Sequence, residues 1–426
     1  MKTRPGIYYI DLSWKGCEEK FTEEPPSKLI CSILETSLEE VTLDSRNYRC
    51  SVYASRENII EQSSDRFFYV DCYPPDLVEV FQEISRDISV ESLKQVLEDI
   101  DGFFTGFIIE KERILFFRDH VGCIPANYML SNKSFKSSTF SRILRNSMSI
   151  PPGRIMEIFK NSFKIEKWYK TKIDRGGDVD FLKNVLVESV SRYIPEKCTV
   201  AFSGGLDSVL IAYIASRIGK NILCVSVGVE GSLDLELSEE AAELLGLNLK
   251  KVIVNREMIE ECVKHFIDFI PRISLMDLSL ATLIYIVALN CVGDIVVSGQ
   301  GADELFGGYY KYAKNLQEKG EKALQGIMMK DILDLHKTNI ERDYVSCMLL
   351  GKRFVQPYLS RKVYDTALRT PLKQKILKSN GIVRKYVLRK VGEVLGLPEK
   401  LVWREKKAAQ YSSGIQKIIS KQIKTQ

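Results

Sequence analysis

A glycine-rich turn between a predicted strand and a predicted helix carries residue types that bind phosphate. The turn follows the apolar run 198–201, precedes the apolar run 209–215, and reads Phe202-Ser203-Gly204-Gly205-Leu206-Asp207-Ser208. Backbone N–H groups at such a turn, backed by the positive end of the helix dipole, favour an anion. A carboxylate would repel phosphate directly, so Asp207 indicates a Mg²⁺ ion between the two. The lysine of a Walker loop is missing.

A second turn of similar chemistry follows the buried strand predicted at 295–297. It reads Ser298-Gly299-Gln300-Gly301-Ala302-Asp303-Glu304. Ligands of parallel sheets bind beyond the carboxyl ends of the strands, so both turns are expected to face one pocket. Asp207 and Asp303 would then hold one Mg²⁺ ion from two sides, as hard oxygen ligands.

Together the two turns resemble the synthetase domain of asparagine synthetases and of the related β-lactam and carbapenam synthetases. In those enzymes the first turn is the pyrophosphate loop, which serves the splitting of ATP into AMP and pyrophosphate. The resemblance implies ATP and Mg²⁺ as cofactors. It also implies nucleotide contacts from Ser203, Gly204, Gly205, Leu206, Ser208, Ser298, Gly299 and Gln300, with Phe202 and Val227 as apolar walls beside adenine. Two unrelated glycine-rich turns are the alternative, which the order of the two strings disfavours.

A basic string near the C-terminus, residues 397–411, resembles the same family's Leu-Pro…Arg-x-Lys signature. Spacing from Arg404 selects Lys406 as the matching lysine, and Lys407 is the alternative one step away. The resemblance implies that this lysine neutralises charge as pyrophosphate leaves and as the later tetrahedral intermediate forms. Without the resemblance, the cluster would be read as the solvated face of a helix.

Bulk composition is that of an ordinary two-domain globular protein. The chain has 426 residues, and 61 basic against 56 acidic side chains leave a formal charge of +5. Such a small excess does not argue for nucleic acid or membrane binding, and neither partner is expected. Residues 1–6 show no apolar signal region. The longest apolar stretch, 275–292, contains Asp277 and Asn290, and it is predicted to be a buried helix rather than a membrane span.

Cysteine and histidine usage narrows the chemistry further. The ten cysteines are scattered without C-x-x-C pairs, which predicts reduced, buried thiols in a cytoplasmic protein. Only three histidines are present, so histidine-based catalysis or metal binding is not expected.

The order of predicted elements divides the chain into two domains, 1–172 and 181–426. Short runs of β-formers mark the first domain at 6–12, 67–71, 103–109 and 114–117. A charged, glycine-containing linker spans 172–180. Beyond it, strands and helices alternate as in a doubly wound parallel sheet, at 199–202, 209–216, 222–229, 236–245 and 249–254. After Gly308 the chain is predicted to be mostly helical.

The first domain resembles the glutaminase domain of the same family, through strings at 101–104, 118–125, 138–141 and 151–153. The resemblance implies a four-layer αββα amidotransferase fold. The family's nucleophile is a cysteine at the mature N-terminus, whereas this sequence begins Met1-Lys2-Thr3 and its first cysteine is Cys17. Thr3, after trimming, is the alternative nucleophile. The glutamine-binding Asn-Gly-Glu string is replaced at 68–74, so no glutamine hydrolysis is expected and the domain's role is expected to be structural.

The whole sequence is therefore read as an ATP-dependent, AMP-forming amide ligase with aspartate and ammonia as the first substrate pair. Gln300 stands where the family commonly has Glu, and Arg353 and Val355 replace a Glu and an Arg. An amide or lactam synthetase acting on another acid or amine thus stays open. So does an RNA-modifying pyrophosphate-loop enzyme, which the family strings argue against, or a catalytically silent scaffold or partner subunit. A homodimer and a separate glutaminase subunit are both compatible with the sequence.

Overall fold

The computed structural model describes residues 4–15, 38–45, 47–84, 88–110, 112–144, 146–160, 162–171, 178–271, 274–379, 381–404 and 413–423. The chain divides into two compact units that are not successive segments. The first unit comprises 1–170 together with 268–271 and 336–351, and the second unit comprises the remaining residues. Each unit is described by itself below.

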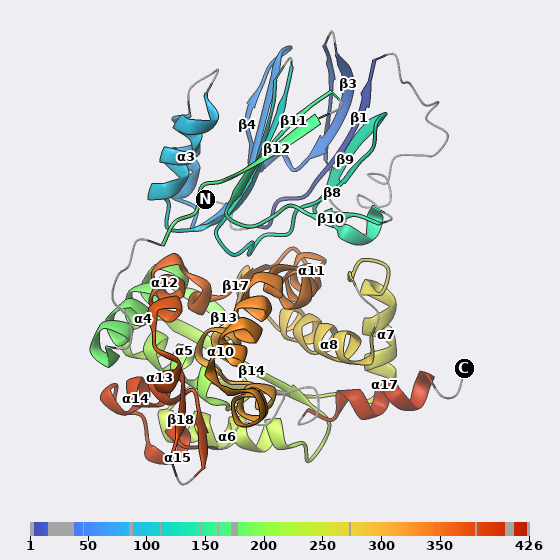
Figure 1. Cartoon of the computed structure of the whole chain (residues 1–426). Helices are drawn as coiled ribbons and strands as arrows, with labels where there is room; N and C mark the ends of the chain where they lie inside the picture. Colours follow the sequence, from blue (N-terminus) through green and yellow to red (C-terminus); the bar gives the residue numbers. More distant parts are fainter. Residues whose placement is uncertain are drawn as a thin grey trace. The chain divides into compact units, whose positions relative to one another are not determined.

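The first unit contains two six-stranded antiparallel sheets that share one core (Figure 1). One sheet has the order β10-β8-β9-β1-β3-β2, with β10 at Met148–Ser149, β8 at Asn127–Leu130, β9 at Ser134–Ser138, β1 at Tyr8–Trp14, β3 at Tyr48–Ala54 and β2 at Glu39–Asp44. The other has the order β12-β11-β7-β6-β5-β4, with β12 at Ser162–Lys167, β11 at Arg154–Phe159, β7 at Ile114–Arg118, β6 at Phe103–Glu110, β5 at Arg66–Tyr73 and β4 at Ile59–Gln62. The four strands predicted in this region are confirmed.

Alternating side chains of these strands form the core between the two sheets. Tyr8, Ile10 and Leu12 of β1 are buried there with Tyr69 of β5 and Phe107 of β6. Because successive strand residues point to opposite faces, the other residues of β5 and β6 face away from this core. Helix α2 (Leu77–Gln82) packs there, with the rings of Phe81 and Phe104 5.5 Å apart, and helix α3 (Val90–Asp99) follows it in the chain. This second covering explains why β5 is buried along its whole length.

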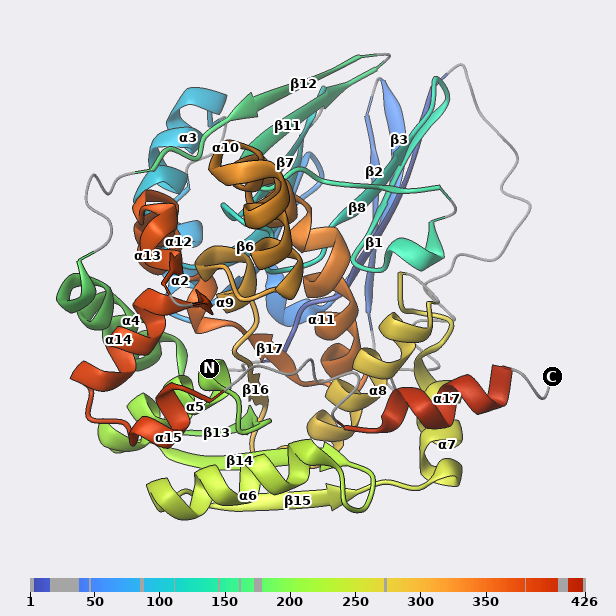
Figure 2. The ribbon, with the colours of Figure 1, turned by 60° about the horizontal axis from the view of Figure 1, so that its bottom comes forward.

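The second unit is built on a five-stranded parallel sheet with the order β15-β14-β13-β16-β17. Its strands are β15 at Leu249–Ile253, β14 at Asn221–Gly228, β13 at Lys197–Ala201, β16 at Ile295–Val297 and β17 at Arg353–Val355. The predicted alternation of strands and helices is confirmed, whereas β17 was not predicted. Helices α5 (Leu206–Arg217) and α8 (Leu275–Leu289) both contact β13 and β14, and α6 (Leu233–Leu245) lies along β14 and β15 (Figure 2).

The predicted buried helix in the longest apolar stretch is α8. Its ten buried residues include Asp277, which lies in the first turn. Ser274 caps the helix by accepting a hydrogen bond from the Asp277 N–H at 3.0 Å and donates its own hydroxyl to the Asp277 carboxylate at 2.6 Å. The cap and the positive helix dipole therefore stabilise a carboxylate inside an otherwise apolar segment. No helix among the described residues is long and apolar enough to cross a bilayer.

The remaining helices of the second unit surround the sheet and its carboxyl edge. They are α4 (Val179–Tyr193), α7 (Arg256–Phe266), α9 (Ala302–Phe306), α10 (Tyr310–Leu335), α12 (Arg361–Arg369), α13 (Leu372–Lys375), α14 (Tyr386–Val394), α15 (Glu399–Val402) and α17 (Ile415–Ile423). A two-stranded hairpin, β18 (Ile376–Lys378) and β19 (Ile382–Arg384), connects α13 to α14.

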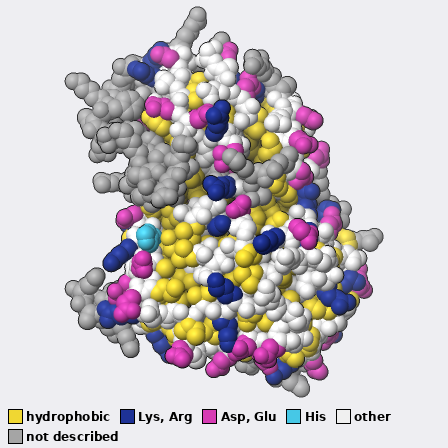
Figure 3. All heavy atoms as spheres, turned by 180° about the vertical axis from the view of Figure 1, so that it is seen from behind, with side chains coloured by type: hydrophobic (Ala, Val, Ile, Leu, Met, Phe, Trp, Pro, Cys, Tyr) yellow, Lys and Arg dark blue, Asp and Glu magenta, His cyan; other side chains and the backbone are white. Residues whose placement is uncertain are grey.

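The described cysteine side chains are free thiols, most of them buried as predicted from the sequence, and the charges on one face of the surface are mixed in sign. Eight cysteines lie among the described residues, all of them free thiols and seven of them buried; Cys17 and Cys31 lie outside those residues. Burial raises the pKa of the Cys262 thiol to about 11 and of Cys198 and Cys224 to about 12. On the face seen in Figure 3, basic and acidic side chains are interspersed rather than gathered by sign.

Candidate active site

The two predicted turns lie side by side at the carboxyl ends of β13 and β16, which are neighbouring strands of the parallel sheet. Gly299 is the point of contact between the turns. A Cβ atom at this glycine would lie 2.8 Å from Cβ of Asp207 and 3.1 Å from the backbone nitrogen of Ser208. Any larger residue would therefore push the second turn away from the first.

Hydrogen bonds within the first turn fix its shape. The Ser208 hydroxyl donates to the Gly205 carbonyl at 3.1 Å and accepts the Ser203 N–H at 3.3 Å. Gly204 has a φ of +68°, and a Cβ there would lie 2.3 Å from the Leu237 carbonyl oxygen of α6. The glycine therefore serves both the left-handed backbone conformation and the close approach of a neighbouring helix.

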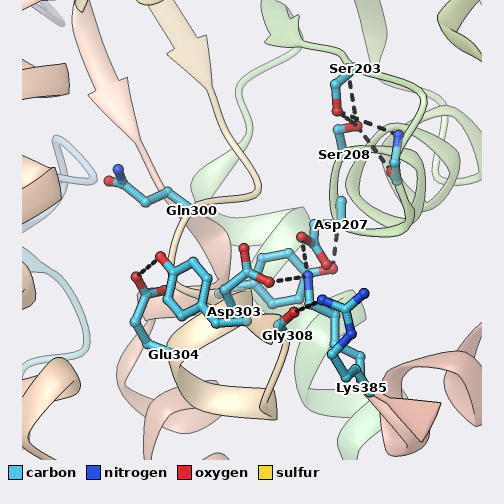
Figure 4. Close-up of polar contacts among 12 residues, drawn as sticks. Ser203, Asp207, Ser208, Gln300, Asp303, Glu304, Gly308 and Lys385 are labelled. Carbon is cyan, nitrogen blue, oxygen red and sulfur yellow. Dashed lines mark hydrogen bonds and ion pairs between the residues drawn. The ribbon is translucent and has the colours of Figure 1, made fainter. Parts of the chain in front are cut away.

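The carboxylates of Asp207 and Asp303 converge on one ammonium group, that of Lys385 (Figure 4). Lys385 Nζ lies 2.7 Å from Oδ1 of Asp303 and forms an equally direct ion pair with Oδ2 of Asp207. The lysine side chain is only 3% exposed, and the two carboxylates are 19% and 17% exposed. The structure thus brings the two predicted carboxylates together, around a cation that the sequence analysis did not identify.

The backbone around Lys385 is specialised to present this ammonium group. Lys385 has φ 56° and ψ 33°, a left-handed conformation that costs a non-glycine residue on the order of 1 kcal/mol. It directly follows β19 and is the N-cap residue of α14. The neighbouring Arg384 donates from Nη1 to the Gly308 carbonyl at 2.8 Å. A Cβ on Gly308 would lie 1.8 Å from Asp303 Oδ1 and 2.1 Å from Cε of Lys385, so only glycine fits.

Two tyrosines contact the acidic residues of the site, Tyr358, which is buried, and Tyr309, which is partly buried. The Tyr358 hydroxyl donates to the backbone carbonyl of Asp207 at 3.3 Å. Burial raises the pKa of Tyr358 well above its usual range, and the carboxylates of Asp207 and Asp303 add to this effect. Tyr309 donates to Glu304 at 2.6 Å, and its pKa is raised by burial first and by that carboxylate second. Both phenols are therefore neutral donors, and neither is a base.

The donor set fits a magnesium ion held jointly with a polyphosphate. Two carboxylates already meet at one cation, and carboxylate oxygens are what Mg²⁺ prefers. No group of three or more His, Cys, Asp or Glu side chains with metal-ligand geometry occurs among the described residues. Mg²⁺ in nucleotide sites is commonly bound by one or two carboxylates plus substrate phosphates, which is what this pair can supply.

Other predicted nucleotide contacts are distributed around this centre. Ser298 donates its N–H to the Val355 carbonyl at 3.0 Å, and its hydroxyl accepts the Gln300 N–H at 3.2 Å. The Gln300 side chain points away from the two carboxylates (Figure 4). Phe202 and Val227 are each only 3% exposed. Burial of this degree fits core packing as well as an apolar wall.

The C-terminal signature is described as far as Arg404. Arg404 donates from Nη1 to the carbonyl oxygen of Gly204 at 2.8 Å and to that of Leu237 at 3.1 Å, and its Nη2 pairs with Glu240. It thereby ties the first turn to α6. Lys406 and Lys407 lie outside the described residues, so their role and register stay predictions.

Lys385, Arg384 and Tyr358 are the site residues that the sequence analysis missed. One available signal was the Asn380-Gly381 pair between two short apolar runs, which is typical of a tight hairpin. That hairpin delivers Arg384 and Lys385 to the site. The lysine itself gave no signal, because it is one of many basic residues in the region.

Comparisons with known proteins identify the family to which this chain is similar. A model of the asparagine synthase family matches residues 182–320 and 312–424. A Methanocaldococcus jannaschii protein named "Putative asparagine synthetase (glutamine-hydrolyzing) 1" is 31% identical over 394 residues, covering 78% of this chain and 72% of that protein. Asparagine synthetase B of Escherichia coli is 27% identical over 366 residues, and the Asparagus officinalis enzyme 24% over 363. This chain covers 64% and 61% of those two relatives.

Proposed function

Because the chain belongs to the asparagine synthase family, we propose that it is an ATP-dependent ligase that converts aspartate to asparagine with ammonia, releasing AMP and pyrophosphate. One observation carries the proposal. Asp207 and Asp303, from two strand-end turns, converge on a single cation beside the glycine-rich turn 203–208. Free thiols at all eight described cysteines favour the cytoplasm as the compartment.

The proposed reaction has two steps. First, a carboxylate oxygen of the acid attacks the α-phosphorus of ATP, and the bond to the bridging oxygen breaks with release of pyrophosphate. Ammonia then attacks the carbonyl carbon of the acyl-adenylate, AMP leaves with the C–O electron pair, and the nitrogen loses a proton. Mg²⁺, when held by Asp207 and Asp303, would neutralise charge on the departing pyrophosphate.

The chain's own residues bind and orient the reactants. The turn 203–208 offers backbone N–H groups and the N-terminus of α5 to the phosphates. Arg404 donates a hydrogen bond to the Gly204 carbonyl. Because that C=O and the Gly205 N–H belong to the same planar peptide unit, this bond also orients the Gly205 N–H. Lys406, carried over from the family signature, would supply a further positive charge to the transition state.

We also propose that the first unit does not hydrolyse glutamine. In place of the family's glutamine-binding string, β5 carries Asp71, which is fully buried. Its Oδ2 accepts the Gly6 N–H at 3.0 Å and the Tyr344 hydroxyl at 3.1 Å. Tyr344 belongs to α11 (Glu341–Met348), a helix of the first unit. Internal partners thus occupy a carboxylate where the family would bind substrate, and Thr3 lies outside the described residues.

A different acid or amine is the second candidate, and Gln300 favours it. A carboxamide cannot take a proton from an incoming amine as a carboxylate can, and the Gln300 side chain points away from the acidic pair (Figure 4). Arg353, which replaces a family Glu, is 3% exposed in β17. The ATP half of the site would be unchanged in this alternative.

ATP–pyrophosphate exchange separates these possibilities. The purified protein is incubated with labelled pyrophosphate, ATP and a panel of amino acids and other carboxylic acids. Exchange that depends on aspartate supports the proposal, and exchange that depends on another acid supports the second candidate. If no acid in the panel supports exchange, the chain is better explained as a silent scaffold or partner subunit.

A further inference from the structure

The ammonium group of Lys385 lies where a divalent ion shared by Asp207 and Asp303 would lie. Both carboxylates reach it directly, one of them at 2.7 Å. The lysine is 3% exposed and belongs to a segment 178 residues distant from Asp207 in sequence. Such a buried, doubly paired cation is a defined part of the site rather than a surface ion pair.

The space at this point is tightly limited. Gly308 has no room for even one added carbon, because a Cβ there would lie 1.8 Å from Asp303 Oδ1 and 2.1 Å from Lys385 Cε. The backbone at Lys385 is held in a left-handed conformation at the start of α14. A second cation therefore cannot enter between the carboxylates while the ammonium group stays there. Repulsion between the two positive charges adds to the steric exclusion.

Charge also differs between the two states of the site. Two carboxylates and one ammonium carry a net charge of −1, so the ammonium neutralises half of the carboxylate charge without any ligand. Without a cation between them, the two carboxylates would repel each other. Replacing the ammonium by Mg²⁺ leaves the lysine's charge to be matched elsewhere, and a polyphosphate beside the metal supplies the matching negative charge.

We propose that Lys385 is an exchangeable counter-ion of the metal site. It holds Asp207 and Asp303 together in the nucleotide-free protein, and it moves its ammonium group to the phosphates when the divalent ion arrives with the nucleotide. The second part of this inference, the movement of the ammonium group to the phosphates, rests on the proposed function. The first part, competition between the ammonium and a divalent ion, concerns the protein alone.

Mn²⁺ binding to the nucleotide-free protein tests the competition directly. Free Mn²⁺ is measured by electron paramagnetic resonance during titration of the wild type and of Lys385→Met. The variant should bind one Mn²⁺ ion at least about tenfold more tightly than the wild type, because a like charge a few ångströms away has been removed. Lys390→Met is the matched control, since Lys390 lies on the same helix, is 38% exposed and pairs with Glu393 instead.

Two further variants keep the test decisive. Adding Asp207→Asn to Lys385→Met should abolish the gained Mn²⁺ site, which assigns it to this carboxylate. If Lys385→Met does not fold, Lys385→Gln retains a hydrogen-bond donor and should shift Mn²⁺ affinity in the same direction. The proposal is overturned if the folded variant binds Mn²⁺ no more tightly than the wild type. Because no ATP is present, this outcome is independent of whether the ligase activity is found.

Discussion

The guanidinium group of Arg404 donates a hydrogen bond to the carbonyl oxygen of Gly204, 200 residues earlier in the sequence, at 2.8 Å. This bond links the C-terminal signature to the turn that is proposed to hold pyrophosphate. Arg404 is 10% exposed and also pairs with Glu240 of α6, so its position is fixed from a second side. The geometry of the turn therefore depends on a residue that need not touch the nucleotide.

Arg404→Ala should weaken the use of ATP without abolishing the chemistry. Misplacing a phosphate-binding turn by about 1 Å costs on the order of 100-fold in kcat/KM, and inhibition by added pyrophosphate should weaken in parallel. Lys400→Ala is the control, because Lys400 also pairs with Glu240 but is 71% exposed. Equal effects of the two substitutions would indicate that only the charge near Glu240 matters.

Asp207→Ala should abolish acid-dependent pyrophosphate release with little loss of fold. The residue contributes a carboxylate to the proposed metal site from the first turn of α5. Pyrophosphate release and far-ultraviolet circular dichroism are measured on the same preparation. Asp294→Ala serves as the control, because Asp294 is 45% exposed, precedes β16 and pairs with Lys352. Near-normal turnover of Asp207→Ala would remove the basis of the proposed function.

Lys406→Ala should lower turnover on the order of 100- to 1000-fold, while the apparent affinity for ATP changes far less. A fixed positive charge aimed at developing negative charge stabilises the transition state more than the bound substrate. Lys406→Arg should rescue only partly, since a planar fork replaces a point charge. Steady-state kinetics of Lys407→Ala provide the comparison. An essential Lys407 beside a dispensable Lys406 would shift the register by one residue.

Purified protein should release no glutamate from glutamine, while ammonium chloride supports product formation. The proposed inactivity rests on the buried Asp71, whose carboxylate already accepts hydrogen bonds from the Gly6 N–H and the Tyr344 hydroxyl. Glutamate release is measured with a coupled dehydrogenase assay, and a glutamine-hydrolysing relative is assayed in parallel as the positive control. Glutaminase activity of this chain alone would contradict the proposed inactivity of the first unit.

Lys375→Met should stabilise the protein at neutral pH. Burial lowers the pKa of Lys375 from 10.5 to about 8, so charging it in the folded state costs up to about 3 kcal/mol relative to the unfolded chain. That cost is fully present below pH 8. It is relieved as the pH rises from 8 toward 10.5, because only the unfolded state binds the proton in that window.

Urea unfolding of the wild type and Lys375→Met at pH 7 and pH 10 measures this effect. The stability gain from Lys375→Met should be largest at pH 7 and should shrink at pH 10. Lys373→Met, on the same short helix but exposed, should change stability little at either pH. A gain that is independent of pH would point to packing rather than to the charge.

Much of the parallel-sheet unit was predictable from sequence. Strands β13, β14 and β16 are short apolar runs that end in glycine-rich turns, and strands covered on both faces have this pattern. The turn residues Asp207 and Asp303 follow from their places after two strands. That the two strands are neighbours, and that Gly299 allows their turns to touch, required the structure.

Strand β17 and the cationic half of the site were not predictable, each for its own physical reason. Strand β17 is only three residues long and begins with Arg353, whose buried guanidinium hides an apolar pattern. Lys385 acquires its role from a left-handed backbone conformation and from a hairpin that carries it to Asp207 across 178 residues. Neither the secondary-structure propensity of lysine nor the hydrophobic periodicity of the sequence predicts a left-handed conformation at this position.

The interleaved division of the chain constrains how this protein can change. Helix α11 lies far along the sequence, yet it belongs to the first unit, where the Glu341 carboxylate accepts hydrogen bonds from Asn127 and the Ser141 N–H, each at 3.1 Å. A gene that had lost the codons for residues 1–177 would still encode helix α11, but Glu341 and Tyr344 would have lost their hydrogen-bond partners. The first unit would thus be retained even after losing every reactive group, because helix α11, which is encoded within the second half of the chain, folds only against it.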